Sequence, residues 1–580
     1  MYSSLRRAPA VSIVVVNYNG VRHLPSCLDS VAELEYPRDE LDVIVVDNAS
    51  TDGSRELLRQ RYPWVRVFAQ ERNLGFGGGN NVAAELAQGR RLVFLNNDMR
   101  VDPSFVTELE RALDETGAAC AGARILDWTG LKVDFAGAGL HFSGFAYQVG
   151  YRREARNVAA GEIRPIIFAC GGAMMIERDV YLDVGGFDGD YFATYEDSDL
   201  GWRLWILGHR VVLAPAAVVY HRHHGTLSVV SEHRRDVLYR RNALVSAIKN
   251  YEEANLRRVL PAALFGTLAG IGEGVALRGL RTLERPVRTS DKTHVPGRKT
   301  GHVFLSPSEV STLVALEHVA AALPRVLEKR ALVQQRRQRT DAEVAPLFGT
   351  PFGRWPDVGP PTQYRVAAAF GVQEIFAQVA RKIAVVARPG DERAGEIANG
   401  LRACGHDVHE VAAQGRARTV AQELFDVDPH ILVVRGVAVL ATLLPAGLWM
   451  PIVVDLDERA ATRGRKALDS LRGFGRADAL IMPARQPDIE RLLARAGWSA
   501  RDLERQVLGI GDSPERIVRV LDEFSRRPVM RTGDHDEVAA WAAGGALAKA
   551  HRAYQLGGPG YAMRLTGAYI RRRVRARLVR

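Results

Sequence analysis

The segment VSIVVVNYNG, residues 11–20, sets the pattern from which the fold is predicted. Residues 11–16 form a continuous apolar run rich in β-branched side chains, which is typical of a strand buried on both faces of a parallel sheet. The residues that follow, Asn17 to Gly20, give a turn signal, and a helix is expected over residues 21–34. This segment therefore predicts a strand, a polar loop and a helix in succession.

The same succession recurs along the next part of the chain. Further strands are expected at residues 41–46, 65–69 and 91–95, separated by helices that end near residues 62 and 87. Alternation of strands and helices favours right-handed crossovers and a parallel sheet. The predicted fold class is therefore α/β.

Each predicted strand ends in a polar or glycine-rich loop. In open α/β sheets, ligands bind at the carboxyl ends of the strands. The side chains expected to face one crevice at this edge are Tyr18, Asp47, Asp52, Arg72, Asn73 and Asp98. The glycine loop FGGGNN, residues 76–81, matches neither a dinucleotide fingerprint nor a P-loop. Its glycines are expected to let the backbone approach a ligand closely.

A second segment that could contribute catalytic or metal-binding side chains is GFDGDYFATYEDSDLGWRLWILG, residues 186–208. Its leucines recur at three-to-four-residue spacing, which predicts a helix that Gly208 ends. Three carboxylates lie in the first turn of this helix: Glu196, Asp197 and Asp199. The helix dipole favours their ionised forms, which suits a base or a metal ligand. Acidic first turns also occur on ordinary helices, so this segment alone leaves both interpretations open.

Composition narrows the class of protein. A chain of 580 residues, 47% hydrophobic and 25% charged, is expected to form about three globular units. The net charge of +11 indicates an anionic partner such as a nucleotide or phospholipid, although arginine-rich composition alone could produce it. The cysteines form no CxxC pair, so neither a zinc knuckle nor a disulfide framework is indicated. Residues 259–277 are too interrupted for a convincing membrane span but suit a membrane interface.

Six segments occur in the order and spacing of one known family: VSIVVVNYNG, VVDNASTDGS, ERNLGFGGGNN, FLNNDMRVDP, CGGAMMIERDVYLDVGGFDGDYFATYEDSDLGWRL and VVYHRHHG. Over residues 8–250 the chain resembles family 2 glycosyltransferases of the GT-A fold. The resemblance is greatest to the rhamnosyltransferase-type branch, which builds bacterial surface polysaccharides. It implies transfer of a sugar from a nucleotide-diphosphate donor with Mg²⁺ or Mn²⁺ as cofactor.

The resemblance assigns roles at the donor and metal sites. It implies that Tyr18 stacks on the donor base and that Asp47 hydrogen-bonds it. The other positions expected to contact the donor are Asp52, Arg72, Asn73 and Asn97. Asp98 matches the last residue of the family's DxD motif, but the triplet here is Asn-Asn-Asp, which lacks one formal charge. His221 matches a third metal ligand of some relatives, with His223 and His224 as competitors; a histidine-rich loop without a metal is the alternative.

The resemblance also assigns roles to the carboxylates in the first turn of the acidic helix. It implies that Asp197 is the base that takes the proton from the acceptor hydroxyl, which gives inversion by single displacement. Asp199 is the alternative base. The positions expected near the acceptor are Gly171, Gly172, Glu196 and Asp199, the glycines leaving room for a sugar.

The rest of the chain is expected to support or localise the transferase. Residues 234–251 form a basic helix that either docks, with residues 259–277, on an anionic membrane or packs on the core. A further helix is expected over residues 313–337. A second α/β unit, resembling the nucleotide-free half of a GT-B enzyme, has strands predicted at 383–387, 407–411, 430–434, 452–455 and 479–482. The arginine-rich residues 561–580 also suit an anionic membrane surface.

We therefore expect four regions. They are a GT-A domain over residues 1–255, a helical or linker region over 256–380, a Rossmann-like α/β domain over 381–527 and a basic helical tail over 528–580. The expected function is glycosyl transfer to a polyprenyl-linked saccharide by a peripheral protein on the cytoplasmic face of the plasma membrane. The alternative is a catalytically silent scaffold in polysaccharide assembly. An RNA-binding role would rest on charge alone, so no nucleic-acid partner is expected.

Overall fold

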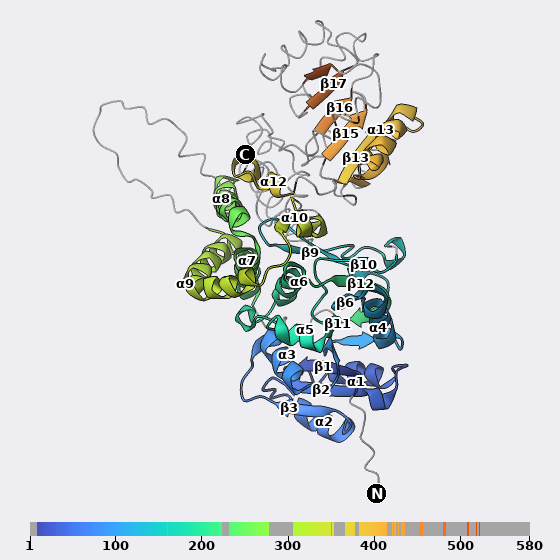
Figure 1. The fold of residues 1–580 in the computed structure, drawn as a ribbon, viewed down its shortest axis with the longest axis vertical. Helices are drawn as coiled ribbons and strands as arrows, with labels where there is room; N and C mark the ends of the chain where they lie inside the picture. The colour runs from blue at the N-terminus through green and yellow to red at the C-terminus, as the bar shows by residue number, and fades with distance from the viewer. Residues whose placement is uncertain are drawn as a thin grey trace, which may run out of the picture. The chain divides into compact units, whose positions relative to one another are not determined.

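The computed structural model describes residues 9–158, 161–222, 231–277, 305–349, 351–352, 366–376 and 382–414, with short segments between 420 and 521. The chain forms two compact units (Figure 1). The first combines Met1–Ala263 with Leu305–Pro351, and the second combines Leu264–Phe304 with Phe352–Arg580. The basic tail over residues 528–580, and with it the expected membrane contact there, lies outside the described residues.

The first unit begins with parallel strands. They are β1 (Val11–Asn17), β2 (Leu41–Asp47), β3 (Arg66–Ala69) and β4 (Arg91–Asn96), which lie side by side in the order β3, β2, β1, β4. The intervening helices are α1 (Leu24–Ala32), α2 (Ser54–Arg61) and α3 (Gly75–Leu86). Apolar residues on both faces of β1 and β2 are buried, as the uninterrupted apolar runs predicted. Each of these strands differs from its predicted bounds by one residue.

The sheet continues beyond β4 with mixed strand directions. The added strands are β5 (Met99–Val101), β6 (Cys120–Asp127), β7 (Val133–Phe135), β10 (Arg164–Pro165), β11 (Ala173–Glu177) and β12 (Val211–His221). The four strands predicted to be parallel are parallel, whereas β11, for which no strand was predicted, lies antiparallel between β4 and β6. Because β11 runs in reverse, it begins at the edge where β4 ends, and this brings the residues before it to the expected ligand edge.

Helices cover the sheet and build the edge at which β4 ends. They include α4 (Phe105–Thr116), α5 (Arg178–Asp183) and α6 (Glu196–Ile206), with a small hairpin of β8 (Ala138–Leu140) and β9 (Ala146–Gln148). α6 begins at the predicted acidic turn and is buried along most of its length. It therefore forms part of the core, and only its first turn is placed to meet a substrate.

A helical layer completes this unit. It contains α7 (Glu232–Asn250), the first part of α8 (Glu253–Leu277), α9 (Pro307–Gln335) and α10 (Asp341–Val344) (Figure 1). Arg330 of α9 donates to the carbonyls of Ile248 and Tyr251, which lie at the end of α7. The last half of α7 is buried, so it packs on the core, as one of the two interpretations of this helix held. Residues 305–351, expected within a helical or linker region, belong to the first unit.

α9 deserves comparison with a membrane helix because of its composition. Among the described residues, it is the helix long and apolar enough to cross a membrane by length and composition. However, α9 also carries Arg330, whose guanidinium is buried against α7. Because Arg330 caps the end of α7, α9 is joined to the rest of the first unit by these hydrogen bonds.

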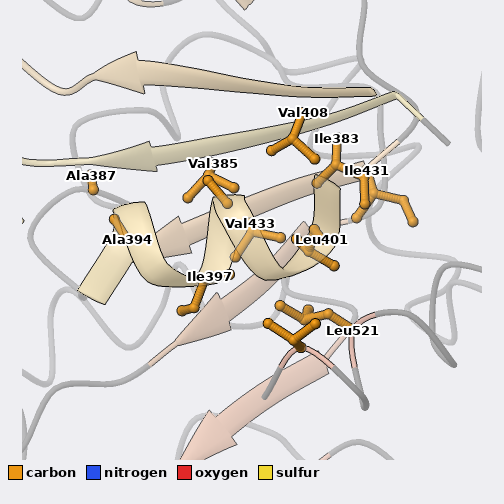
Figure 2. Close-up of a cluster of buried hydrophobic side chains, with 12 residues drawn as sticks. Ile383, Val385, Ala387, Ala394, Ile397, Leu401, Val408, Ile431, Val433 and Leu521 are labelled. Atoms are coloured by element: carbon orange, nitrogen blue, oxygen red, sulfur yellow. The ribbon is translucent and has the colours of Figure 1, made fainter. Parts of the chain in front are cut away.

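The second unit contains a parallel sheet. Its strands are β13 (Lys382–Ala387), β14 (Asp407–Ala412), β15 (Ile431–Arg435), β16 (Ile452–Asp455), β17 (Ala479–Met482) and β18 (Val507–Gly509), in the order β14, β13, β15, β16, β17, β18. Helix α13 (Glu392–Ala403) presents Ile397 and Leu401 to Val385 and Val433 of the sheet (Figure 2). A short helix, α12 (Val372–Ile375), precedes this sheet in the chain. The predicted strands are all present, and β18 was not foreseen because its run is only three residues long.

Candidate active site

Asp197 lies in the first turn of α6 and is partly exposed. Its Oδ2 accepts a hydrogen bond from the backbone N–H of Gly171 at 3.1 Å, and its Oδ1 accepts from the N–H of Ser198 at 2.8 Å. No cation among the described residues forms an ion pair with it. A carboxylate held by backbone amides without a neutralising partner is suited to accept a proton.

Glu196 lies beside Asp197 and has a different environment. It is 7% exposed, and within the described part of the chain its Oε2 has no hydrogen-bond partner. Burial, together with the charge of Asp197, raises the pKa of Glu196 to about 8. Burial also raises the pKa of Asp197, but the two amide N–H groups oppose this shift. The two carboxyls titrate as a pair, and the two amide donors favour the charged form of Asp197, whereas no such donor reaches Oε2 of Glu196 in the described part of the chain.

Asp199 is fully buried and engaged in the fold. It accepts from Arg203 Nε at 2.8 Å and from Lys249 Nζ at 2.9 Å, with further bonds from Tyr191 and Asn250. Burial alone would raise the pKa of Asp199, but the two cations outweigh burial and lower it. The assignments of Asp199 as an acceptor contact and as an alternative base are therefore corrected: its oxygens are already occupied.

Asp98 and His221, the two residues predicted to bind a metal, lie side by side, together with a third residue that sequence reasoning missed. His221 Nε2 lies 3.4 Å from Asp98 Oδ2, and His221 Nδ1 lies 2.6 Å from Asp134 Oδ2. Burial would lower the pKa of His221, but its bonds to Asp134 and Asp98 outweigh burial and raise it to about 9. The signal for Asp134 was a single carboxylate within the buried strand β7. His223 and His224 lie outside the described residues.

These residues fit a divalent cation. Within the described residues no group of three metal-ligating side chains stands ready-made. Asp98 offers one carboxylate, and a cation could replace the proton on His221 Nε2, while Asp134 keeps the imidazole oriented through Nδ1. The other ligands of such an ion would come from a bound diphosphate and water.

The metal end and Asp197 lie at the same sheet edge. Asn96, two residues before Asp98, donates its backbone N–H to the carbonyl of Gly172 at 2.9 Å, and the neighbouring Gly171 holds Asp197. Cys170, which precedes them, is close to both ends: burial raises its pKa, and the charges of Asp197 and Asp134 raise it further. Sequence-distant loops therefore converge here as expected.

The two glycines at this edge have a different role from the one predicted. A Cβ at Gly172 would lie 2.4 Å from the Asn96 side-chain nitrogen, and one at Gly171 would lie 3.2 Å from Cβ of Asp197. Neither glycine leaves open space for a sugar. They allow β4, β11 and α6 to approach closely, which sets the spacing between the two ends of the site.

The donor end is built from the loops after β1 and β2. Asp47 is fully buried and bonds to Arg55, to the N–H of Ser50 and to Asn17. Asn17 in turn accepts from the Asn97 side chain at 2.8 Å. Arg55 and Asn17 were missed by sequence reasoning, because an arginine in a helix and an asparagine in a turn have common structural roles. The Asn97 amide, predicted to contact the donor, belongs to this internal network and is buried.

The other residues predicted to contact the donor differ in whether their side chains are already engaged or remain accessible. Asp52 accepts from the N–H groups of Val21 and Ser54, and the Asn73 side chain accepts from the N–H of Gly75. Asp52 therefore joins the loop after β2 to the one after β1, whereas Asn73 fixes its own loop. Arg72 is exposed and Tyr18 is half-buried, so both remain accessible to a donor.

Comparison with known proteins agrees with this architecture. Residues 12–185 match the model of "Glycosyl transferase family 2". The chain is 30% identical over 241 residues to the N-acetylglucosaminyl-diphospho-decaprenol L-rhamnosyltransferase of Mycobacterium tuberculosis, covering 37% of this chain and 76% of that protein. It is also 30% identical over 227 residues to the O-antigen biosynthesis protein RfbC of Myxococcus xanthus, covering 37% of this chain but only 18% of that protein.

Among solved structures, that of residues 1–349 of S. aureus TarS with UDP aligns at 19% identity and a TM-score of 0.34, over 47% of this chain and 76% of that chain. The family match and the coverage of the mycobacterial relative are the decisive findings. The chain belongs to glycosyl transferase family 2, and its first unit is a glycosyltransferase domain of the GT-A fold.

Proposed function

We propose that this protein is an inverting, metal-dependent glycosyltransferase. It transfers a sugar from a nucleotide-diphosphate donor to a lipid-linked saccharide in cell-wall or surface-polysaccharide assembly. The observation that carries the proposal is Asp197: a partly exposed carboxylate that has amide donors on both oxygens and, within the described part of the chain, no ion pair with a cation. The donor sugar class and the polyprenyl acceptor are suggested by the name of the mycobacterial relative.

In this mechanism Asp197 takes the proton from the acceptor hydroxyl as its oxygen attacks the anomeric carbon. Glu196, which stays protonated near neutral pH, keeps a second negative charge away from Asp197 and can donate to a hydroxyl of the acceptor. No enzyme-bound sugar is needed, because a single displacement by the acceptor inverts the anomeric centre.

At the other end, Asp98 and His221 would hold Mg²⁺ or Mn²⁺, and Asp134 would orient the imidazole. The bound ion would neutralise charge on the departing diphosphate. Tyr18 and Arg72 are the accessible side chains beside the donor loops, and Asp47 fixes the loop between them. The chain's own residues thus bind the donor at one end and activate the acceptor at the other.

We place the protein at the cytoplasmic face of the plasma membrane, where a polyprenyl-linked acceptor would be reached. The net charge of +11 supports attraction to anionic lipids. Exposed apolar side chains on α9, among them Val310, Leu313 and Leu327, suit the same surface. Flotation of the full chain with vesicles containing anionic lipid, but not with neutral vesicles, tests this localisation.

The decisive test of function is Asp197→Asn in the full chain. With nucleotide-sugars and N-acetylglucosaminyl-diphospho-decaprenol as trial substrates, the variant should lose about 10²- to 10⁴-fold in turnover, because a general base of this kind contributes that much. Nucleotide binding, followed by calorimetry with UDP and dTDP, should remain. Asp179→Asn, a change in the exposed first turn of α5, is the matched control.

Three outcomes would count against the proposal. Wild-type turnover by Asp197→Asn would remove Asp197 as the base. Unchanged transfer in excess EDTA would remove the metal. Absence of transfer and of donor hydrolysis by the wild-type protein across the nucleotide-sugar panel would favour a silent scaffold.

A further inference from the structure

The carboxylates between residues 188 and 199 divide into two groups. Asp188, Asp190 and Asp199 form ion pairs with Lys or Arg side chains, whereas Glu196 and Asp197 have none among the described residues. The division is not one of burial, because Glu196 is nearly as buried as Asp188 and Asp199. The division follows from which carboxylates form ion pairs with lysine and arginine side chains of the neighbouring helices.

The cations come chiefly from α7 and α9. Lys249 of α7 is 2% exposed and bridges Asp188 at 2.7 Å and Asp199 at 2.9 Å. Lys329 of α9 binds Asp188 and also Asp190, the latter at 2.8 Å. These lysines therefore tie both ends of the segment to the helical layer, and the pKa of Asp188 is held below its usual range because Lys249 and Lys329 outweigh burial.

Between these ties the backbone is strained. Phe192, Thr194 and Tyr195 have φ angles of 62°, 68° and 68°, in the left-handed region that non-glycine residues seldom adopt. Each such residue costs about 1–3 kcal/mol and persists only where the surroundings hold it. The strained stretch ends directly before Glu196 and Asp197.

A single buried amide holds this stretch. The Asn242 side chain of α7, fully buried, donates to the carbonyls of Tyr191 and Ala193 at 3.2 Å and of Thr194 at 2.9 Å. On its opposite side, the carbonyl of Phe192 accepts from the N–H of Phe76, which lies in the glycine loop at the start of α3. The stretch therefore connects the helical layer to the donor side of the site.

We propose that α7 and α9 act as a helical clamp that positions the catalytic loop, defined as residues 188–195, and with it the carboxylate of Asp197. The positioning residues are Asn242, Lys249 and Lys329. All three lie outside residues 12–185, the part that matches the family model. The proposal rests on the proposed function in that Asp197 is the base.

Loosening the clamp should change chemistry more than binding. A reacting group displaced by about 1 Å can cost about 10²-fold in rate, because the acceptor hydroxyl and base no longer meet in line. The donor loops after β1 and β2 do not depend on Asn242 or Lys329. Donor affinity should therefore be preserved while the turnover falls.

The test uses two conservative variants of the full chain. Asn242→Asp keeps the side-chain shape and the acceptor of the bond from Arg241, but removes the donor to the three carbonyls. Lys329→Gln removes the partly exposed cation. The matched control is Arg336→Gln, at the end of the same helix α9, which loses an ion pair to Asp183 outside the catalytic loop.

We expect kcat to fall about 100-fold in Asn242→Asp and about 10-fold in Lys329→Gln, with UDP or dTDP affinity within about twofold of wild type. Hydrogen exchange of the amides at residues 188–197 should accelerate in both variants and not in Arg336→Gln. This second readout needs no turnover, so it separates failure of the clamp from failure of the proposed function.

The clamp is overturned if exchange in the catalytic loop matches the control. It is equally overturned if exchange rises but kcat changes no more than in Arg336→Gln, because the loop would then not position the base. A variant that loses donor affinity in step with kcat would show general damage to the site and would also contradict the proposal.

Discussion

The region that carries the family motifs and the helical layer that follows it are built on different principles. Residues 12–185 place polar loops at the ends of buried strands, so their residue types are readable along the sequence. Residues 232–250 and 307–341 form ordinary-looking helices without motifs. Yet Asn242 and Lys249, from this layer, bind Thr194 and Asp199, which lie on either side of Asp197.

The comparison shows that the motif-bearing region and the helical layer contribute different things to the site. In the proposed mechanism the motif residues supply the reacting groups, whereas side chains of the helices form the ion pairs that neutralise some of the carboxylates. Asp197 and Asp199 are two residues apart in one helical turn, yet only Asp199 is reached by Lys249 and Arg203. The division of roles between them therefore depends on side chains far away in the sequence.

The largest expected effect on stability is that of Lys249→Met. It leaves Asp188 and Asp199 buried without their shared cation, and breaking such a buried pair costs about 3–5 kcal/mol. Urea unfolding of wild type and variant at pH 7 measures the difference. The difference should shrink as the pH falls below the ordinary carboxyl pKa, because both aspartates have lowered pKa values and their contribution is lost on protonation.

The control for this variant is Arg257→Met, which breaks an exposed pair with Glu253 on α8 and should change stability little. A Lys249→Met protein as stable as this control would contradict the contrast between the two regions, because the helical layer would then add nothing to the acidic segment.

The sequence predicted the parallel half of the sheet almost to the residue. A buried parallel strand reads as a nearly continuous apolar run, and β1 and β2 are such runs apart from Ser12 and Asp42, which bond to each other. Asp98 was expected at the ligand edge from the same pattern, whereas the role of Asp197 was implied only by the resemblance to family 2 glycosyltransferases. β11 was not foreseen as antiparallel, because strand direction depends on chain connection rather than on local periodicity.

The partners of the site residues could not be predicted. Asp134 and Arg55 come from segments with no motif, and nothing in the local sequence says that they reach His221 and Asp47. The same holds for Asp199, whose first-turn position is equivalent to that of Asp197 until Lys249 is placed. Long-range pairing between side chains, rather than local propensity, decides these roles.

A second prediction concerns Glu196, the buried carboxyl without a cation. Its pKa is raised to about 8, so the folded protein keeps it protonated while the unfolded chain ionises it above its ordinary value. Stability of the wild type should therefore fall, relative to Glu196→Gln, as the pH rises from about 4.5 to 8. The difference should be on the order of 2 to 3 kcal/mol at pH 7, since one unit of pKa corresponds to about 1.4 kcal/mol.

Chemical unfolding at pH 4.5, 6 and 8 checks this prediction. At pH 4.5 the folded wild type binds the proton and the unfolded chain still binds it about half of the time, so the two proteins should differ least there. A difference that is constant with pH would mean that Glu196 is ionised in the folded protein, which would remove the distinction between Glu196 and Asp197.

The smallest expected effect tests the motif-bearing region itself. Asp134→Asn keeps the size of the side chain but weakens the hold on His221 Nδ1, and the loss of such an outer partner typically lowers metal affinity about 10- to 100-fold. Calorimetric titration of Mn²⁺ into the full chain with UDP present measures the affinity directly, with Asp179→Asn as control. Because the change leaves the helical clamp untouched, hydrogen exchange at residues 188–197 should stay at the wild-type rate. Unaltered Mn²⁺ affinity would mean that His221 does not ligate the ion, and the metal end would then rest on Asp98 alone.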